Sequence, residues 1–134
     1  MVEDHQKLIE LSFTNEIEDM PKTPFLKNVQ KELEEYFRGK RKTFNIPITL
    51  SGTDFEMKVY QALMDIPYGT VCSYKQIAKQ IGNEKACRAI GQANHKNRII
   101  IIVPCHRVIQ QDGRIGGYGG GIDKKRLLLN IEGK

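Results

Sequence analysis

The sequence predicts an α/β protein whose C-terminal part contains a helix-turn-helix. Three observations lead to this prediction. Helix-capping patterns begin two amphipathic segments, one at Thr53 and one at Ser73. A glycine, Gly82, separates two short helical segments, as in a helix-turn-helix. Five consecutive β-branched residues, 99–103, are typical of a strand that is buried on both faces.

The N-terminal part is expected to contain two strands and one helix. Apolar and polar residues alternate loosely over residues 7–13, which predicts a first strand. Thr23 followed by Pro24 is typical of a helix start, because threonine caps a helix and proline fits its first turn. This helix should end at Gly39. The apolar face of this helix contains Leu26, Val29, Leu33 and Phe37. After the helix, a second strand is expected over residues 44–50.

The C-terminal part begins with two capping boxes. Thr53 and Glu56 form the first, and the helix that follows should end before Pro67. Ser73 and Gln76 form the second and begin a shorter helix. The apolar face of the first of these helices contains Phe55, Val59, Ala62, Leu63 and Ile66.

The shorter helix should end at Gly82, and another helix is expected over residues 84–94. Two short helices around a glycine turn indicate a helix-turn-helix, although any αα-hairpin would give the same pattern. Ala78 is small enough to let the two helices pack closely. A helix surface of small residues around one cation could lie in a shallow groove of DNA while Arg88 reaches between bases. Taken alone, Arg88 would more often be a solvated surface arginine. The expected contact surface of the second helix consists of Ala86, Arg88, Ala89 and Ala93.

Composition narrows the functional classes. The chain has 134 residues, enough for one domain with a buried core, or for one domain with a small appendage. A net charge of +5 favours a polyanionic partner. Three cysteines without regular spacing argue for a reducing compartment, so we expect a cytoplasmic protein, or a nuclear one in a eukaryote. No secretory signal follows Met1, and no apolar run is long enough to span a membrane.

The most reactive triplet is the Cys-His-Arg sequence of residues 105–107. Pro104 ends the strand expected over residues 99–103, so the three side chains should lie at the exit of that strand. Neighbouring positive charge lowers the pKa of a thiol, and a histidine can accept the thiol proton directly or through one water. A buried structural cysteine would give the same triplet. Six glycines over residues 113–121 favour a site, since they allow close approach of the backbone to a ligand.

Segments around this triplet resemble one known family. The sequence PCHRV, with Asn97 upstream and GGYGGG downstream, is similar to the active-site segment of the O6-alkylguanine-DNA alkyltransferases, the methylated-DNA–protein-cysteine methyltransferases. The resemblance extends from about Thr53 to Gly133 and includes IPYGTVCSY, KACRAIG and LLLNIEG. PCHRV with both flanks is a very specific signal, whereas one segment alone would be a moderate one.

The resemblance implies a fold and an activity. It implies a winged helix-turn-helix-like C-terminal domain over residues 51–134 and a reduced ribonuclease-H-like N-terminal element over residues 1–50. The implied activity is DNA repair by nucleotide flipping and a single, irreversible transfer of the alkyl group from O6-alkylguanine to Cys105, with O4-alkylthymine as a further candidate substrate. The expected partner is double-stranded DNA, and the expected state is a monomer. We expect no cofactor, and no metal because ligands found in some relatives are not evident.

The resemblance also assigns roles in the reaction. It implies that Cys105 is the nucleophile, that His106 is the base acting through water, and that Glu132 orients His106. Asn97 would tie the helix-turn-helix to the active-site strand, and Arg107 would tether the loop. From the sequence alone, Glu132 would be an ordinary surface acid at the end of a helix, so its role rests on the resemblance.

Five further residues are assigned to substrate or DNA binding on the same basis. Tyr74 would lie beside the rotated phosphate and the base edge, unless it is a half-buried packing residue. Arg88 would fill the space that the extruded nucleotide leaves. Tyr118 and the backbone of Gly119 would border the alkyl pocket. Lys125 would add positive potential near the leaving base, unless it is a solvated lysine of the last helix.

Two departures from the family pattern stand out. Gly119 lies where relatives often have serine, so a hydroxyl bond to the O6 atom is lost. Arg98 lies where relatives often have proline after the asparagine, which loosens the hinge. Cys72 and Cys87 match no family role and are interpreted as small packing residues.

Three other functions are compatible with parts of this pattern. An alkyltransferase-like protein would bind the lesion without transfer, but known proteins of that kind lack the reactive cysteine. A cysteine hydrolase using the same nucleophile, base and carboxylate would turn over repeatedly and need no DNA. A winged-helix regulator would not need Cys105 at all.

Overall fold

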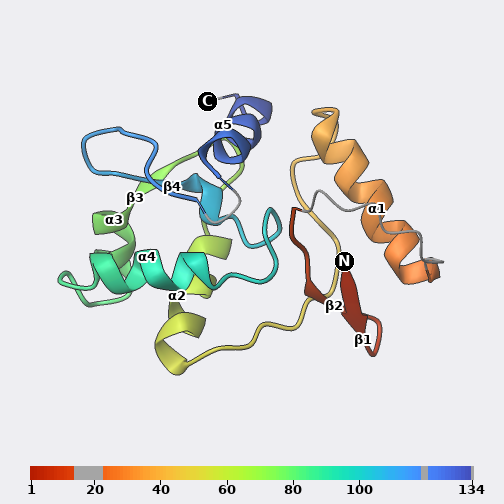
Figure 1. Cartoon of the computed structure of the whole chain (residues 1–134), viewed down its shortest axis with the longest axis horizontal. Helices are drawn as coiled ribbons and strands as arrows, with labels where there is room; N and C mark the ends of the chain where they lie inside the picture. The colour runs from red at the N-terminus through yellow and green to blue at the C-terminus, as the bar shows by residue number, and fades with distance from the viewer. Residues whose placement is uncertain (14–22, 119–120, 134) are drawn as a thin grey trace.

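The computed structural model describes residues 1–13, 23–118 and 121–133, and it confirms the predicted α/β class (Figure 1). Figure 1 shows two parts side by side: β1, β2 and α1 form one, and the remaining elements form the other. The elements are β1 (Val2–Asp4), β2 (Lys7–Glu10), α1 (Pro24–Phe37), α2 (Asp54–Met64), β3 (Cys72–Ser73), α3 (Tyr74–Gln80), α4 (Cys87–His95), the short 3-10 helix η1 (Cys105–Arg107), β4 (Val108–Ile109) and α5 (Ile122–Ile131).

The chain begins with a β-hairpin that the sequence revealed only in part. β1 and β2 pair antiparallel, and His5 and Gln6 between them have φ values of 50° and 60°. Two successive residues with positive φ form the tight turn that suits the twist of a hairpin. The strand predicted over residues 7–13 is therefore shorter, since β2 ends at Glu10, and its hairpin partner was not predicted.

Helix α1 has the predicted ends but a different buried face. The Thr23 side chain accepts a hydrogen bond from the Leu26 N–H at 3.2 Å, and Gly39, at φ 73°, follows the helix. The prediction that Phe37 packs in the core is wrong, because Phe37 is 41% exposed and Tyr36 is fully buried. Tyr36 follows Leu33 by three residues, so it also fits the helical spacing.

The strand predicted over residues 44–50 is wrong, because this segment pairs through one bridge only. Leu8 bridges to Ile48, and three residues further on Leu11 bridges to Ile99 instead. Residues 44–50 therefore pair with the N-terminal segment at one position only. An extended segment that has lost its neighbour cannot continue a ladder.

The strand predicted over residues 99–103 is also wrong, because its centre is a turn. Ile101 has a φ of 72°, which a strand does not permit. The side chain of Asn97 holds this turn from both ends: its Oδ1 accepts from the Ile99 N–H at 3.0 Å, and its Nδ2 donates to the Val103 carbonyl at 2.9 Å. An apolar run alone does not reveal such a local side-chain contact.

Both predicted capping boxes are confirmed. The Thr53 hydroxyl accepts from the Glu56 N–H at 3.1 Å, and Glu56 accepts from the Thr53 N–H at 2.9 Å. Ser73 and Gln76 make the same exchange at 3.1 and 2.7 Å. Gly82, at φ 79°, follows α3 as predicted. These local contacts fix where α2 and α3 begin.

Helices α3 and α4 pack together in the predicted helix-turn-helix arrangement, with Ala78 fully buried. The second helix starts at Cys87, three residues later than predicted, and no side chain caps it. The predicted contact surface is wrong in part, because Ala86 and Ala93 are buried in the core while Arg88 is exposed. The two small residues let α4 pack closely against its neighbours, and Arg88 lies on the opposite, exposed face of the helix.

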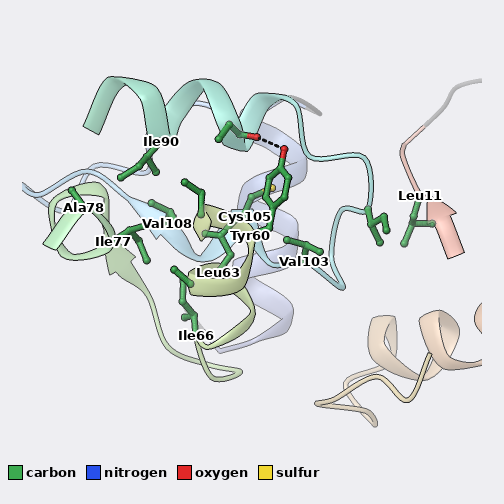
Figure 2. Packing of buried hydrophobic residues seen from close by; sticks show 14 of the residues in the cluster. Leu11, Tyr60, Leu63, Ile66, Ile77, Ala78, Ile90, Val103, Cys105 and Val108 are labelled. Atoms are coloured by element: carbon green, nitrogen blue, oxygen red, sulfur yellow. Dashed lines mark hydrogen bonds between the residues drawn. The ribbon is translucent and has the colours of Figure 1, made fainter. Parts of the chain in front are cut away.

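One hydrophobic core connects α2, α3, α4 and β4 (Figure 2). Leu63, Ile77, Ile90 and Val108 in this core are fully buried. Each such side chain stabilises the fold by about 1.5–3 kcal/mol relative to exposure. The parallel pairing of β3 with β4 fixes the chain from Val108 onwards, and Cys105, three residues earlier, also belongs to this core. In the described ranges, every helix is too short or too polar to span a bilayer.

Candidate active site

Cys105 opens the short helix η1 rather than following a strand, so the predicted strand-exit position is wrong. Its side chain is 4% exposed, and its Sγ accepts a hydrogen bond from Asn97 Nδ2 at 3.3 Å. The same Asn97 amide donates to the Val103 carbonyl, and strand β4 begins at Val108. A turn on one side and a paired strand on the other therefore hold the thiol in place.

The surroundings of Cys105 favour the neutral thiol. Burial raises the pKa of Cys105, and the Asn97 hydrogen bond and the nearby Lys125 charge offset only part of this effect. The expectation that neighbouring positive charge lowers the pKa of this cysteine does not describe the resting protein. A thiolate at Cys105 must therefore form by proton transfer to a base.

His106 and Glu132 lie together in the interior, 26 residues apart in the chain. His106 Nε2 is 2.7 Å from Glu132 Oε2, and both side chains are buried. Burial raises the pKa of Glu132, but hydrogen bonds from His106, Arg107 and Tyr36 outweigh it and lower the pKa to about 2. The carboxylate can then only accept, so His106 Nε2 carries a proton and Nδ1 is free to act as a base. Burial lowers the pKa of His106, which keeps the resting imidazole neutral.

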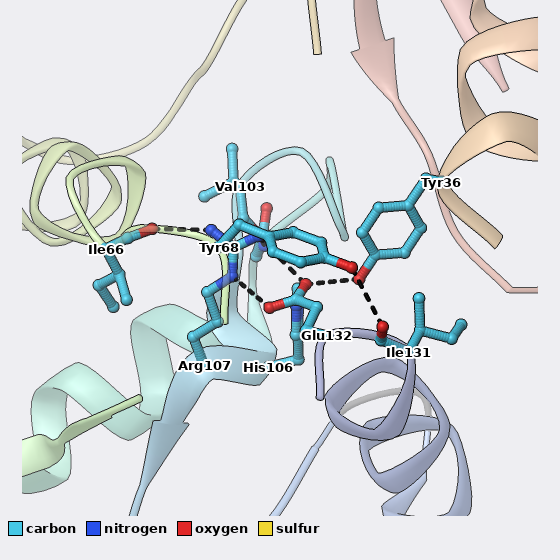
Figure 3. A network of polar contacts seen from close by, with 9 residues as sticks. Tyr36, Ile66, Tyr68, Val103, His106, Arg107, Ile131 and Glu132 are labelled. Atoms are coloured by element: carbon cyan, nitrogen blue, oxygen red, sulfur yellow. Dashed lines mark hydrogen bonds and ion pairs between the residues drawn. The ribbon is translucent and has the colours of Figure 1, made fainter. Parts of the chain in front are cut away.

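Arg107 links this pair to the segment that follows helix α2 (Figure 3). Its Nε and Nη2 donate to the two oxygens of Glu132 at 2.8 and 3.1 Å, and its Nη1 donates to the Ile66 carbonyl at 2.7 Å. The guanidinium also lies 5.7 Å from the centre of the Tyr68 ring. The structure thus places the Arg107 guanidinium in a two-pronged contact with the Glu132 carboxylate.

Sequence reasoning missed Tyr36 of α1. Its hydroxyl donates to Glu132 Oε2 at 2.5 Å across 96 residues of sequence. A signal was available, because Tyr36 continues the apolar spacing of the helix, and a buried tyrosine hydroxyl usually finds a polar partner. Which partner it finds depends on the packing of the two parts of the chain, which local patterns do not predict.

A cavity of about 180 Å³ opens at Cys105 and is lined by Tyr74, Asn94 and Tyr118. Among the described residues, neither polar atom of the Asn94 amide makes a hydrogen bond of normal geometry, and the buried Tyr118 hydroxyl makes none either. Burial raises the pKa of Tyr74, and the neighbouring Asn94 amide offsets part of this rise. A second cavity of about 190 Å³ shares Asn94, Cys105 and Tyr118 and is also lined by Phe13 of the N-terminal element.

Lys125 is fully buried, so the interpretation of a solvated lysine is wrong. Its Nζ donates to the Val108 carbonyl at 2.6 Å and to the Gly117 carbonyl at 3.1 Å. Burial lowers the pKa of Lys125 to about 8, although the nearby Cys105 acts in the opposite direction. Gly116 has a φ of 75°, a backbone conformation that glycine adopts without steric cost, and a Cβ there would be in ordinary contact with Lys125 Nζ at 3.6 Å.

Arg88 lies apart from the thiol, on the exposed face of α4. A shallow depression on this face is lined by Arg88, Gly91, Gln92, His95 and Lys96, and Gly91 and His95 also line the cavity at Cys105. The exposed face of α4 and the reactive cavity are therefore continuous. Gly119 lies outside the described residues. Within the described part of the chain, no cluster of three or more His, Cys, Asp or Glu side chains could hold a metal ion.

The arrangement joins a nucleophile, a base and a carboxylate with a cavity beside them. Cys105 faces the cavity, and the imidazole next to it has a fixed tautomer because Glu132 accepts from Nε2. Among the described residues, no group pairs with His106 Nδ1. Such a site can make a thiolate when a substrate arrives.

Comparisons with known proteins agree with this geometry. Residues 54–134 match the model of the 6-O-methylguanine DNA methyltransferase DNA-binding domain, and residues 1–50 match its ribonuclease-like domain. A methylated-DNA–protein-cysteine methyltransferase of Methanosarcina acetivorans is 49% identical over 109 residues, 81% of this chain and 70% of that protein. One of Bacillus subtilis, described as constitutive, is 50% identical over 111 residues, 82% of this chain and 67% of that protein. The crystal structure of Mycobacterium tuberculosis OGT in complex with DNA superposes with a TM-score of 0.88 at 41% identity, covering 98% of this chain and 84% of that one.

Proposed function

Because the chain belongs to the 6-O-methylguanine DNA methyltransferase family, we propose that it repairs DNA by moving the alkyl group of O6-alkylguanine irreversibly to Cys105. The observation that carries the proposal is the buried thiol beside a cavity, next to a histidine whose tautomer Glu132 fixes. Neither the relatives' names nor the fold assigns these residues to the reaction. Their contacts support the assignment.

The proposed reaction is an in-line displacement at an sp³ carbon. The proton of Cys105 passes through one water to Nδ1 of His106, and Glu132 stabilises the imidazolium that forms. The thiolate attacks the alkyl carbon, so an S–C bond forms while the C–O6 bond breaks. The electron pair of the broken bond goes to the guanine, which then takes up one proton. Lys125 supplies positive potential where this negative charge develops.

The alkyl group of a paired base lies inside the duplex, so the nucleotide must leave the stack first. This costs a few kcal/mol, which contacts to the DNA must offset. We assign Arg88, on the exposed face of α4, to the space that the nucleotide vacates, and Tyr74, in the cavity wall, to the base edge. Tyr118 and Gly119 are assigned to the border of the alkyl pocket.

Three further assignments complete the proposal. Asn97 orients the thiol and the turn before it, because its amide contacts both. Arg107 has a structural role, since its donors are used by Glu132 and the Ile66 carbonyl. The division into residues 1–50 and 51–134, the monomeric state, the cytoplasmic location and the use of O4-alkylthymine remain proposals.

Turnover and mass test the proposal. A thioether at Cys105 has a poor leaving group and no carbonyl for water to attack, so each molecule should act once. Incubation with a methylated duplex should give product equal to the active protein, and the protein should gain the mass of one methyl group. The modified peptide should contain Cys105 and not Cys72 or Cys87, and Cys105→Ala should bind DNA without transfer. Sustained turnover would indicate a hydrolase, and a label on another cysteine would refute the assignment.

A further inference from the structure

The N-terminal element sends one side chain into the rear of the active site. Tyr36, near the end of α1, is fully buried, and its hydroxyl donates to Glu132 Oε2 at 2.5 Å (Figure 3). The same oxygen lies 2.7 Å from His106 Nε2. One carboxylate oxygen is therefore shared between a helix of the N-terminal element and the imidazole beside Cys105.

The direction of this hydrogen bond is fixed. Burial raises the pKa of Tyr36, so its hydroxyl stays protonated, while Glu132, with a pKa of about 2, stays ionised. Tyr36 can then only donate, and a hydrogen bond to a charged acceptor is about twice as strong as one between neutral groups. Packing of the Tyr36 ring also holds the hydroxyl in place, because the centres of the Phe44 and Tyr68 rings lie 5.5 and 6.2 Å from the centre of the Tyr36 ring.

We propose that Tyr36 is a positioning residue for alkyl transfer: its hydroxyl holds Glu132 Oε2 against His106 and limits how strongly the imidazole binds a proton. The proposal rests on the transfer to Cys105 proposed above. The hydroxyl draws part of the carboxylate charge toward itself, which leaves less charge for the imidazolium. Without the hydroxyl, Glu132 would give its full charge to His106, and the pKa of His106 would rise.

Besides Tyr36 and Glu132, other charged or titratable groups lie around His106 on the elements packed against it. They are Lys125 of α5, Cys105 and Arg107 of η1, and Tyr68 of the segment after α2. Replacing the tyrosine hydroxyl alone leaves the charges of Arg107 and Lys125 unchanged. A change in the titration of His106 would therefore report the lost hydrogen bond itself.

The test compares Tyr36→Phe with Tyr68→Phe. Both variants keep the ring, but the Tyr68 hydroxyl donates to the Ile131 carbonyl at 3.0 Å and not to Glu132. In Tyr36→Phe, the NMR titration midpoint of His106 in the DNA-free protein should rise by about 0.5–1 pH unit. At pH values below that midpoint, less imidazole is neutral, so the single-turnover rate constant should fall by the same factor of about 3–10. Tyr68→Phe should leave both quantities unchanged.

An unchanged titration of His106 in Tyr36→Phe, or an equal change in Tyr68→Phe, would overturn the proposal. A rate loss that is uniform across pH would also contradict it, because it would indicate a merely structural role. The unaltered protein gives a second readout: the Cζ resonance of Tyr36 should follow the titration of His106, and its independence would contradict the proposal. If the unaltered protein transfers nothing to Cys105, the proposed function fails, whereas the titration still decides the role of Tyr36.

Discussion

The two sides of Cys105 differ in how their polar groups are paired. On the side of α1 and α5, Glu132 accepts hydrogen bonds from His106, Arg107 and Tyr36. On the side of the cavity, the buried polar atoms of Asn94 and Tyr118 make no hydrogen bond of normal geometry within the described part of the chain. We call the first set the rear network and the second, with Tyr74 and the exposed face of α4, the front surface.

This difference indicates a division of labour. A buried polar group without a partner costs about 1–3 kcal/mol, so proteins rarely keep one without a use. In the rear network, Glu132 has its donors before any substrate arrives, and His106 Nδ1, which has no partner among the described residues, is the atom that would accept the thiol proton. The front surface is incomplete and is suited to a substrate that supplies the missing partners. The following predictions would break or sharpen this comparison.

The largest effect is expected from Glu132→Gln in the rear network. Loss of the carboxylate leaves Arg107 buried without its counter-ion, which should lower the free energy of unfolding by about 3 kcal/mol or more. His106 also loses the acceptor that stabilises its charged form, so transfer should slow by about 100-fold or more on any substrate. Denaturant unfolding and single-turnover kinetics measure the two effects. Glu34→Gln, an exposed acid of α1, is the matched control and should change neither.

Acid should weaken the rear network through Glu132. The pKa of Glu132 is about 2 in the folded protein, against an ordinary value of 4.5. A lowered folded pKa gives stability that is full above pH 4.5 and is lost as the pH falls towards 2. The loss amounts to about 3 kcal/mol. The free energy of unfolding, measured between pH 4.5 and 2, should fall in the unaltered protein and change less in Glu132→Gln. An equal dependence on pH in the two proteins would contradict this role of Glu132.

On the front surface, salt dependence should report Arg88. Binding of duplex DNA by the Cys105→Ala protein should weaken as salt rises, because phosphate contacts release counterions. Because Arg88 would bring one positive charge into the DNA, Arg88→Ala should reduce the slope of log affinity against log salt by about 1. Arg126→Ala, an exposed arginine of α5, should leave the slope unchanged. An affinity indifferent to salt would favour a different use of this face.

The smallest effect concerns the loop between the two sides. Gly116 has a φ of 75°, in the left-handed region, so Gly116→Ala should cost about 1–2 kcal/mol although the added Cβ would make only ordinary contacts. At Gly117, an added methyl group would meet no atom within 4 Å and the φ is not positive, so Gly117→Ala should cost much less. Thermal unfolding of the pair measures the difference. Equal costs would show that the backbone conformation at Gly116 does not matter.

Local chemistry explains which parts of the fold could be predicted. The capping boxes at Thr53 and Ser73 and the glycine at position 82 act on their own neighbours, and the structure confirms all three. The apolar run over residues 99–103 was misleading, because its conformation is set by Asn97, whose side chain reaches across six residues to Val103. Hydrophobicity shows that a segment is buried, but it does not show its backbone conformation.

The candidate site shows the same limit. Cys105 and His106 could be singled out because they are adjacent, and Glu132 could be added only through the family resemblance. Tyr36 could not be placed, since its contact with Glu132 depends on how α1 packs against α5. Contacts between distant segments are properties of the fold, whereas sequence patterns report mainly on neighbours.

The most direct test of the division of labour compares two substrates at one cysteine. Single-turnover rate constants for transfer to Cys105 would be measured with a methylated duplex and with free O6-benzylguanine, for Arg88→Ala and for Glu132→Gln. Arg88→Ala should slow the duplex reaction about tenfold or more and spare the free base, because a free base needs no extrusion. Glu132→Gln should slow both reactions by the same factor. Equal losses on both substrates in Arg88→Ala, or a loss confined to the duplex in Glu132→Gln, would contradict the assignment of chemistry to the rear network and of DNA handling to the front surface.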